Sequence, residues 1–119
     1  MTMTPRRLID RIRQGDEVAF ADVLEAIAAH YHYTPTAFAN GLGARRFVNA
    51  AGENEGSCKV FAFARLHGLE EAETLRLFGE HYRHVLDTPT GTDHRNIRTF
   101  MADGWKGIEF FGEAFRPRR

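Results

Sequence analysis

Apolar residues recur at helical spacing along most of this chain. The first such stripe consists of Leu8, Ile9 and Ile12. Its helix is predicted to begin at Thr4-Pro5, a hydroxyl cap followed by proline in the first turn, and to end at Gly15. A second helix is expected to begin with Asp16 as its cap, and its buried stripe is Phe20, Val23, Leu24, Ile27 and Tyr31.

The pattern changes after this second stripe, where aromatic residues and histidines alternate. Pro35 disfavours helical geometry at Thr34, so the chain becomes extended there. Short strands are predicted at residues 37–39 and 44–49, joined by a turn at residues 40–43, and another at residues 107–111.

Three further helices are predicted in the second half of the chain. The first is capped by Ser57 and ends at about His67, and its middle is apolar on nearly every side, which is typical of a buried central helix. The next covers residues 70–86, with a buried stripe of Leu75, Phe78, Tyr82, Val85 and Leu86. The last is capped by Thr92 or Asp93 and ends at Asp103-Gly104. Its inward-facing residues are predicted to be Ile97, Phe100 and Met101.

These elements predict a mainly α fold, with α+β as the alternative, in a single domain over residues 1–119. We expect about five helices and at most two or three short strands. The core is placed at about residues 16–111, with an N-terminal helix at 1–15 and a basic, solvated tail at 112–119. Hydrophobic residues make up 43% of the sequence and include ten Phe, enough for a core without metals or disulfides.

The charge balance narrows the class of partner. Sixteen basic residues match sixteen acidic ones, so no long-range attraction to nucleic acid or to an anionic membrane is expected. No apolar run approaches the ~18 residues of a membrane span, and the single cysteine favours a cytoplasmic location. A protein partner and a homo-oligomer are left open.

The polar segment from residue 49 to residue 58 is the candidate site. It places two glycines and several polar side chains before a helix N-terminus, where unpaired backbone N–H groups favour anions. The candidate ligand or anion-binding residues are Asn49, Glu53, Asn54, Glu55 and Ser57. The alternative is an ordered loop whose side chains bond to the loop itself.

Cys58 is a candidate nucleophile because the first turn of a helix lowers the pKa of a thiol. Such a thiol needs a base, for which His81, with His67 and His94, is a candidate. The segment Gly56-Ser57-Cys58 is similar to the nucleophile segment of papain-like proteases, but too few residues follow it for that domain. The alternative is that Cys58 packs as a small apolar residue.

No metal and no cofactor are predicted. His81 and His84 share one helix face, but the sequence shows no tight cluster of ligands and no HExxH pattern. Neither a phosphate-binding P-loop nor a dinucleotide-binding glycine pattern is present.

Five segments of the chain carry a family resemblance. They are Tyr33-Thr-Pro-Thr-Ala-Phe-Ala-Asn-Gly41, Asn54-Glu-Gly-Ser-Cys-Lys-Val-Phe-Ala-Phe-Ala64, Leu66-His-Gly-Leu69, Thr74-Leu-Arg-Leu-Phe-Gly-Glu-His-Tyr82 and Gly91-Thr-Asp-His-Arg-Asn-Ile-Arg98. From about Phe20 to Phe111 the chain resembles the HopJ type III effector family.

This resemblance implies a bacterial protein that is delivered into host cells by type III secretion or that acts inside the bacterium. It implies no particular reaction, cofactor or catalytic residue. We therefore expect a HopJ-like protein that acts through protein interaction or through a small-ligand surface. The alternative is a small thiol-dependent enzyme that uses Cys58 with a histidine base, so the question of catalysis stays open at this point.

Overall fold

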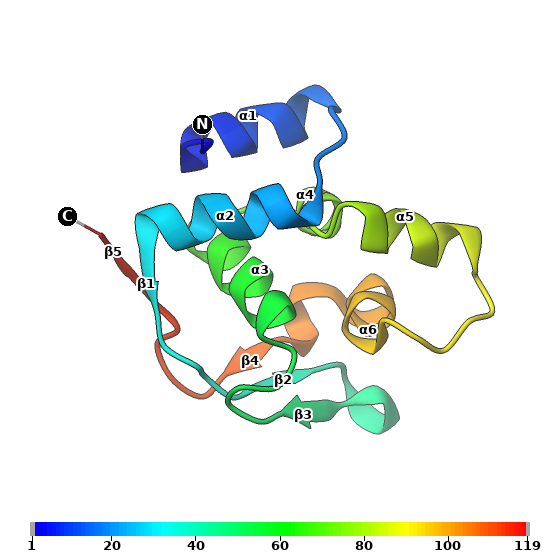
Figure 1. The fold of residues 1–119 in the computed structure, drawn as a ribbon. Helices are drawn as coiled ribbons and strands as arrows, with labels where there is room; N and C mark the ends of the chain where they lie inside the picture. The colour runs from blue at the N-terminus through cyan, green and yellow to red at the C-terminus, as the bar shows by residue number, and fades with distance from the viewer. Residues whose placement is uncertain (1, 119) are drawn as a thin grey trace.

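Helix α3 (Glu55–Leu66) runs through the middle of the molecule and organises the fold (Figure 1). The structure is a computed structural model that describes residues 2–118. Helices α1 and α2 lie on one side of α3, and a small sheet lies on the other. The remaining helices are α1 (Pro5–Gln14), α2 (Phe20–His30), α4 (Glu71–Arg76), α5 (Glu80–Asp87) and α6 (Arg95–Asp103), with 3₁₀ turns η1 (Gly43–Arg45) and η2 (Gly104–Gly107).

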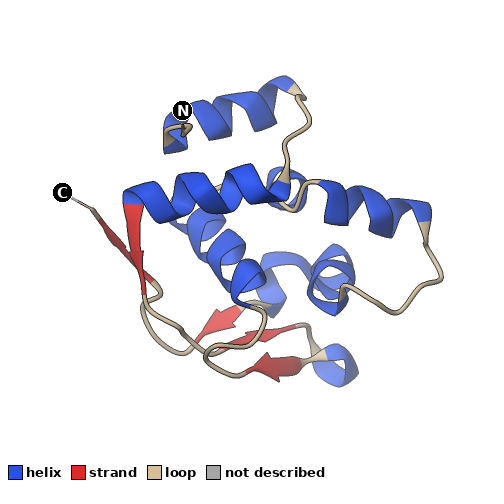
Figure 2. Ribbon diagram, in the orientation of Figure 1, coloured by secondary structure: helices blue, strands red, loops and turns tan. Residues whose placement is uncertain are grey.

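The strands form two small antiparallel sheets, coloured red in Figure 2. One pairs β1 (Tyr31–Tyr33) with β5 (Phe115–Pro117), and the other has the order β3 (Phe47–Asn49), β2 (Phe38–Asn40), β4 (Glu109–Phe110). The predicted hairpin and late strand are present but shorter than predicted, because 3₁₀ turns occupy residues 43–45 and 104–107. The fold is α+β rather than all-helical, and its five strands exceed the two or three that were expected.

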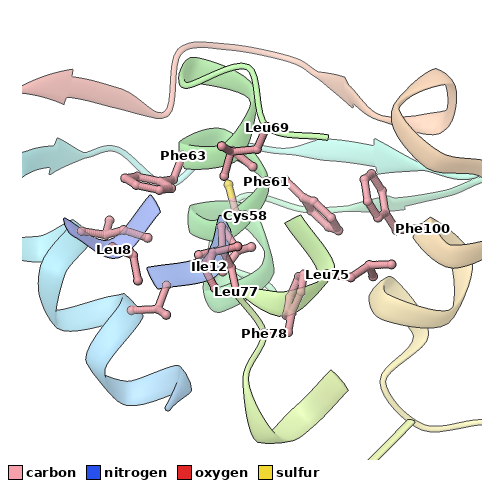
Figure 3. Close-up of a cluster of buried hydrophobic side chains, with 14 of the residues drawn as sticks. Leu8, Ile12, Cys58, Phe61, Phe63, Leu69, Leu75, Leu77, Phe78 and Phe100 are labelled. Carbon is pink, nitrogen blue, oxygen red and sulfur yellow. The ribbon is translucent and has the colours of Figure 1, made fainter. Parts of the chain in front are cut away.

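The core is an aromatic cluster around α3, as predicted from the apolar middle of this helix (Figure 3). Phe61 is fully buried at its centre. Its ring lies 4.9 Å from that of Phe100 and 5.4 Å from that of Phe78, measured between centroids. Phe78 lies in the turn between α4 and α5, and Phe100 lies in α6. These contacts therefore join the second half of the chain to the central helix.

The ends of the first two helices show where local signals succeed and fail. Thr4 caps α1 by accepting a hydrogen bond from Arg7 N, as predicted. The prediction that Asp16 caps α2 is wrong, because α2 begins only at Phe20. The carboxylate of Glu80 accepts a hydrogen bond from Phe20 N at 2.9 Å, and this bond lowers the pKa of Glu80. A side chain distant in sequence therefore satisfies this helix end.

The helix predicted over residues 70–86 is divided into α4 and α5. The break lies at Gly79, whose φ of 59° and ψ of −129° are incompatible with a continuous helix. The backbone of Val18 and Phe20 packs directly against this glycine. The break also changes the buried face, so that Leu77 is fully buried while Leu86 is half exposed, contrary to the predicted stripe.

The C-terminal segment differs from the expected solvated tail. Residues 115–117 pair with β1 in antiparallel register, and Arg118 N donates to His30 O at 2.9 Å. Phe115 stacks on Tyr31, with ring centroids 5.0 Å apart. The basic side chain of Arg116 is exposed to solvent, as predicted, although the backbone of this segment is paired in a sheet.

Within residues 2–118, no helix is long and apolar enough to cross a membrane.

Candidate functional site

A pocket of about 340 Å³ lies where the N-termini of α3 and α6 meet. Helix α5 contributes His81 to one side of it. The lining comprises Phe20, Asn54, Gly56, Ser57, Phe78, His81, His94, Arg95, Asn96 and Ile97. The pocket therefore joins the polar loop singled out in the sequence to the start of the last helix.

The two helices begin in the same unusual way. Asn54 precedes α3 with φ 48°, and His94 precedes α6 with φ 52°. Among residues 2–118 these are the two non-glycine residues with positive φ. Neither helix has a side-chain cap, so the predictions that Ser57 caps α3 and that Thr92 or Asp93 caps α6 are wrong. Their first-turn N–H groups are left for another acceptor.

The charge of the lining is one-sided. His81, His94 and Arg95 are basic, and the lining includes no carboxylate. The guanidinium of Arg95 lies over the ring of Phe47, 3.7 Å from its centroid, and Phe47 itself is not part of the lining. The positive ends of two helix dipoles add to this field. The pocket is therefore suited to an anion.

A buried amide network, which we call the Asn cluster, fixes the two helix ends relative to each other. It consists of Asn40, Asn49 and Asn96, all at most 5% exposed, with Asn54 at its edge. Asn96 Nδ2 donates to Asn49 Oδ1 at 3.0 Å, and Asn54 Nδ2 donates to the same oxygen at 2.7 Å. One oxygen thus links the start of α6 to the residue before α3.

The predicted ligand-binding residues separate into two groups. Asn54 and Ser57 line the pocket. Asn49 is buried in the Asn cluster, and Glu53 accepts a hydrogen bond from Ala50 N within its own loop. Glu55 lies beside Tyr33 and Cys58, and it contributes, after burial and Cys58, to raising the pKa of Tyr33. Sequence reasoning missed Arg95 and Asn96 as pocket residues, although both fall in a segment that carried the family resemblance.

Cys58 lies inside the core (Figure 3), and it is not among the residues that line the pocket. Its side chain is 1% exposed, and Sγ lies 3.5 Å from Thr36 O. Burial raises the pKa of this thiol. The groups that act on the thiol are Tyr33, Thr36, Glu55 and Lys59, and no described imidazole is among them. This environment is opposite to that of an activated cysteine nucleophile and gives the thiol-enzyme hypothesis no support.

The three candidate bases lie in different surroundings. His81 and His94 belong to the pocket, and their ring centroids are 5.2 Å apart. His67 lies at the end of α3, where Nε2 is 2.6 Å from the hydroxyl of Tyr31. Burial lowers the pKa of His67 below its usual 6.5. Burial at this position therefore favours the neutral form of His67.

We expect His67 to make stability depend on pH. The pKa of His67 is lower in the folded state than in the unfolded state. The contribution of His67 to the free energy of unfolding is therefore complete above about pH 6.5, and it is lost as the pH falls below that value toward the folded pKa. The variant H67Q should lose less stability than the wild type between pH 7.5 and pH 5, about the range over which an unfolded histidine takes up its proton. Urea unfolding at several pH values measures this, with the exposed His32→Gln variant as control. Equal pH profiles for wild type and H67Q would disprove the assignment.

A second group of side chains could hold a metal ion beside the pocket. Single ligand atoms of His84, Asp93 and His94 all lie within 4.8 Å of one another. These residues come from α5 and from the segment before α6, so their closeness is not visible in sequence spacing.

Together, the fold and the pocket define a small α+β domain whose candidate site is formed by helix N-termini. The family model of the HopJ type III effector protein matches residues 6–115. The chain belongs to the HopJ type III effector family.

A solved structure supports this assignment of the fold. The crystal structure of VPA0580, described as a protein of unknown function, is similar to this chain with a TM-score of 0.91 and 39% sequence identity. The match covers 99% of this chain and 97% of that chain. A comparison with curated proteins finds no match. Family and fold are therefore established, and function must be argued from the site.

Proposed function

We propose that this HopJ-family protein binds a small organic anion, through a phosphate or carboxylate group, in the pocket between α3 and α6. The observation that best supports the proposal is the meeting of two helix N-termini without side-chain caps in one basic hollow. Each N-terminus behaves as roughly half a positive charge. An oxyanion between them can accept hydrogen bonds from both first turns.

The helices are long enough for this effect, since α3 has 12 residues and α6 has 9. Charge-assisted hydrogen bonds contribute about 1.5–3 kcal/mol each, roughly twice as much as neutral ones. The nearby bases His81 and His94 add positive charge when protonated. The Asn cluster supplies preorganisation, because the helix ends need not move together when the anion binds.

The apolar part of the lining indicates what else the ligand contains. The rings of Phe20 and Phe78 are nearly parallel, with an interplanar angle of 8° and centroids 6.1 Å apart. Gly56 faces Phe20 so closely that an added Cβ would lie 2.8 Å from its ring. An apolar wall beside an anion-binding end favours a ligand with a charged group on a small apolar or aromatic body.

The test uses phenyl phosphate as the probe and Ser57→Asp as the variant. An aspartate in the first turn of α3 is favourable for the helix, so the variant should fold at least as stably as the wild type. Its carboxylate repels an anion and competes for the same N–H groups. We expect binding, followed by backbone amide chemical shifts, to weaken by about tenfold or more, which corresponds to roughly 1.4 kcal/mol.

The matched control is Ser57→Asn, which has a similar shape without the charge. It should retain binding to within a few fold. The amides that shift should be those of residues 55–57 and 95–97. If wild type shows no shift at these amides with tens of millimolar phenyl phosphate, or if S57D binds as well as S57N, the proposal fails.

Other activities suggested by the sequence and the family remain predictions. A protein partner or a second copy of the chain could bind at an exposed groove that includes Leu86 and Met101. Met101, which was predicted to face inward, is 43% exposed there. Delivery by type III secretion is what the family description implies for its members.

A further inference from the structure

Three imidazoles and one carboxylate meet beside the anion pocket. His81 and His84 project from α5, and Asp93 and His94 immediately precede α6. The ring centroid of His94 lies 5.2 Å from that of His81 and 5.5 Å from that of His84. We call His84, Asp93 and His94 the His–Asp cluster, because their ligand atoms lie within 4.8 Å of one another.

The carboxylate of Asp93 is held in place by Arg98. Arg98 Nη2 donates to Asp93 Oδ1 at 2.7 Å, and Arg98 Nε donates to the backbone oxygen of Asp93 at 2.6 Å. Only 17% of the Arg98 side chain is exposed, so this support is itself packed. The other carboxylate oxygen, Oδ2, is left facing both imidazoles. Outer hydrogen bonds of this kind orient metal ligands in proteins.

Two of the three distances between ligand atoms are close to those around a bound metal ion, and the third, between His84 and His94, is at most 4.8 Å. Asp93 Oδ2 lies 3.3 Å from His84 Nε2 and 3.9 Å from His94 Nε2. Zinc binds nitrogen and oxygen at about 2.0–2.2 Å, so neighbouring ligand atoms of a tetrahedral site are separated by roughly 3.4 Å. The first distance already matches this separation, and the second requires a movement of about half an ångström of a partly exposed ring.

A simple ion pair explains the His–Asp cluster less well than a metal site does. An exposed pair between Asp93 and one histidine contributes little to stability. Three imidazoles near one another repel when they are protonated, whereas neutral imidazoles are good ligands for divalent transition metals. The arrangement therefore suits a cation that binds all of these groups in their deprotonated forms.

We propose that His84, Asp93 and His94 form a binding site for a divalent transition-metal ion such as Zn²⁺. Three protein ligands leave a fourth position, for which His81 is the nearest further imidazole and water is the alternative. The proposal differs from the sequence-based expectation of no metal, which rested on the absence of a ligand pattern in the sequence. Because His94 also lines the anion pocket, a bound cation would add positive charge at its edge.

The experiment titrates Zn²⁺ into the full-length, untagged protein after treatment with a chelator, using isothermal calorimetry. Wild type should bind about one equivalent, and H84A and H94A should each bind at least tenfold more weakly, as expected for the loss of a ligand. Asp93→Asn keeps an acceptor for Arg98 but removes the anionic ligand, and it should weaken binding in the same direction. Titration with Co²⁺ should give the intense visible absorption of tetrahedral coordination in wild type and lose it in H84A.

His32→Ala is the matched control, because His32 is an exposed histidine on β1, outside the cluster. It should bind Zn²⁺ as the wild type does. The side chains of His84 and His94 are 52% and 29% exposed, so their removal should leave the circular dichroism spectrum unchanged. The proposal is overturned if wild type binds no stoichiometric Zn²⁺, or if H84A and H94A bind it as tightly as H32A.

This site is independent of the proposed anion function, and the two can fail separately. His84 is not part of the pocket lining, so H84A should retain phenyl phosphate binding when no metal is present. Ser57→Asp should lose phenyl phosphate binding and keep Zn²⁺ binding. If S57D and H84A each abolished both activities, the sites would not be separate and the assignment of ligands would be wrong.

Discussion

Replacing Asn96 with alanine is expected to lower the free energy of unfolding by about 3 kcal/mol. The Asn96 side chain is 5% exposed and accepts hydrogen bonds from both Asn40 Nδ2 and Asn49 Nδ2, at 3.0 and 3.2 Å. Its own Nδ2 donates to Asn49 Oδ1. Alanine removes all three bonds and leaves neighbouring amides buried without these partners. Leaving such a group unpaired costs about 1–3 kcal/mol, more than a typical hydrogen bond contributes when it forms.

Urea unfolding of the Asn96→Ala variant measures this loss. The matched control is Asn54→Gly, which removes the exposed member of the same network. Asn54 has φ 48°, a conformation that glycine adopts without strain. The relief of backbone strain in the glycine variant should offset the loss of the hydrogen bond from Asn54 to Asn49. The control should change stability by no more than about 0.5 kcal/mol. Should both variants lose the same stability, the Asn cluster is not what holds the two helix ends together.

Replacing Gly79 with alanine is expected to be more damaging still, lowering the free energy of unfolding by about 4 kcal/mol. An added Cβ would lie 2.7 Å from Val18 O and 2.7 Å from Phe20 N. Both are backbone atoms, so no side chain can turn away to make room. The backbone at Gly79, with φ 59° and ψ −129°, is also one that L-residues rarely adopt.

Thermal and urea unfolding of Gly79→Ala test this expectation against Gly43→Ala. Gly43 has nearly the same φ, 56°, but an added Cβ there would meet no atom within 4 Å. The control therefore shares the positive φ of Gly79 but lacks its close backbone contacts, and it should cost about 1 kcal/mol. A loss in G79A no larger than that in G43A would show that the contact between Gly79 and the start of α2 is not tight.

Residues close in sequence determined several parts of this fold. Thr4-Pro5 and Gly15 define α1 by capping and by backbone freedom, which act within one helical turn. The apolar middle of α3 correctly indicated the centre of the core, because a helix that is apolar all round must be covered on every side. The strands around the turn at residues 40–43 were also found from local alternation.

The site was only partly visible in the sequence. Asn54 and Ser57 were identified because small polar residues before a helix are a local signal. Arg95 and Asn96 were not, because nothing near them shows that their helix begins opposite α3. Cys58 had the sequence context of a reactive thiol, but the packing of the core around it decided its environment.

The sequence by itself thus determined the family, the central helix and the loop at which to look. The tertiary structure alone decided the break at Gly79, the cap that Glu80 provides for α2, the pocket between two helix N-termini and the approach of His84 to Asp93. The physical reason is the distance along the chain over which each effect acts. Propensity, periodicity and capping act over a few residues, whereas each of these features is a contact between segments that meet only when the core has formed.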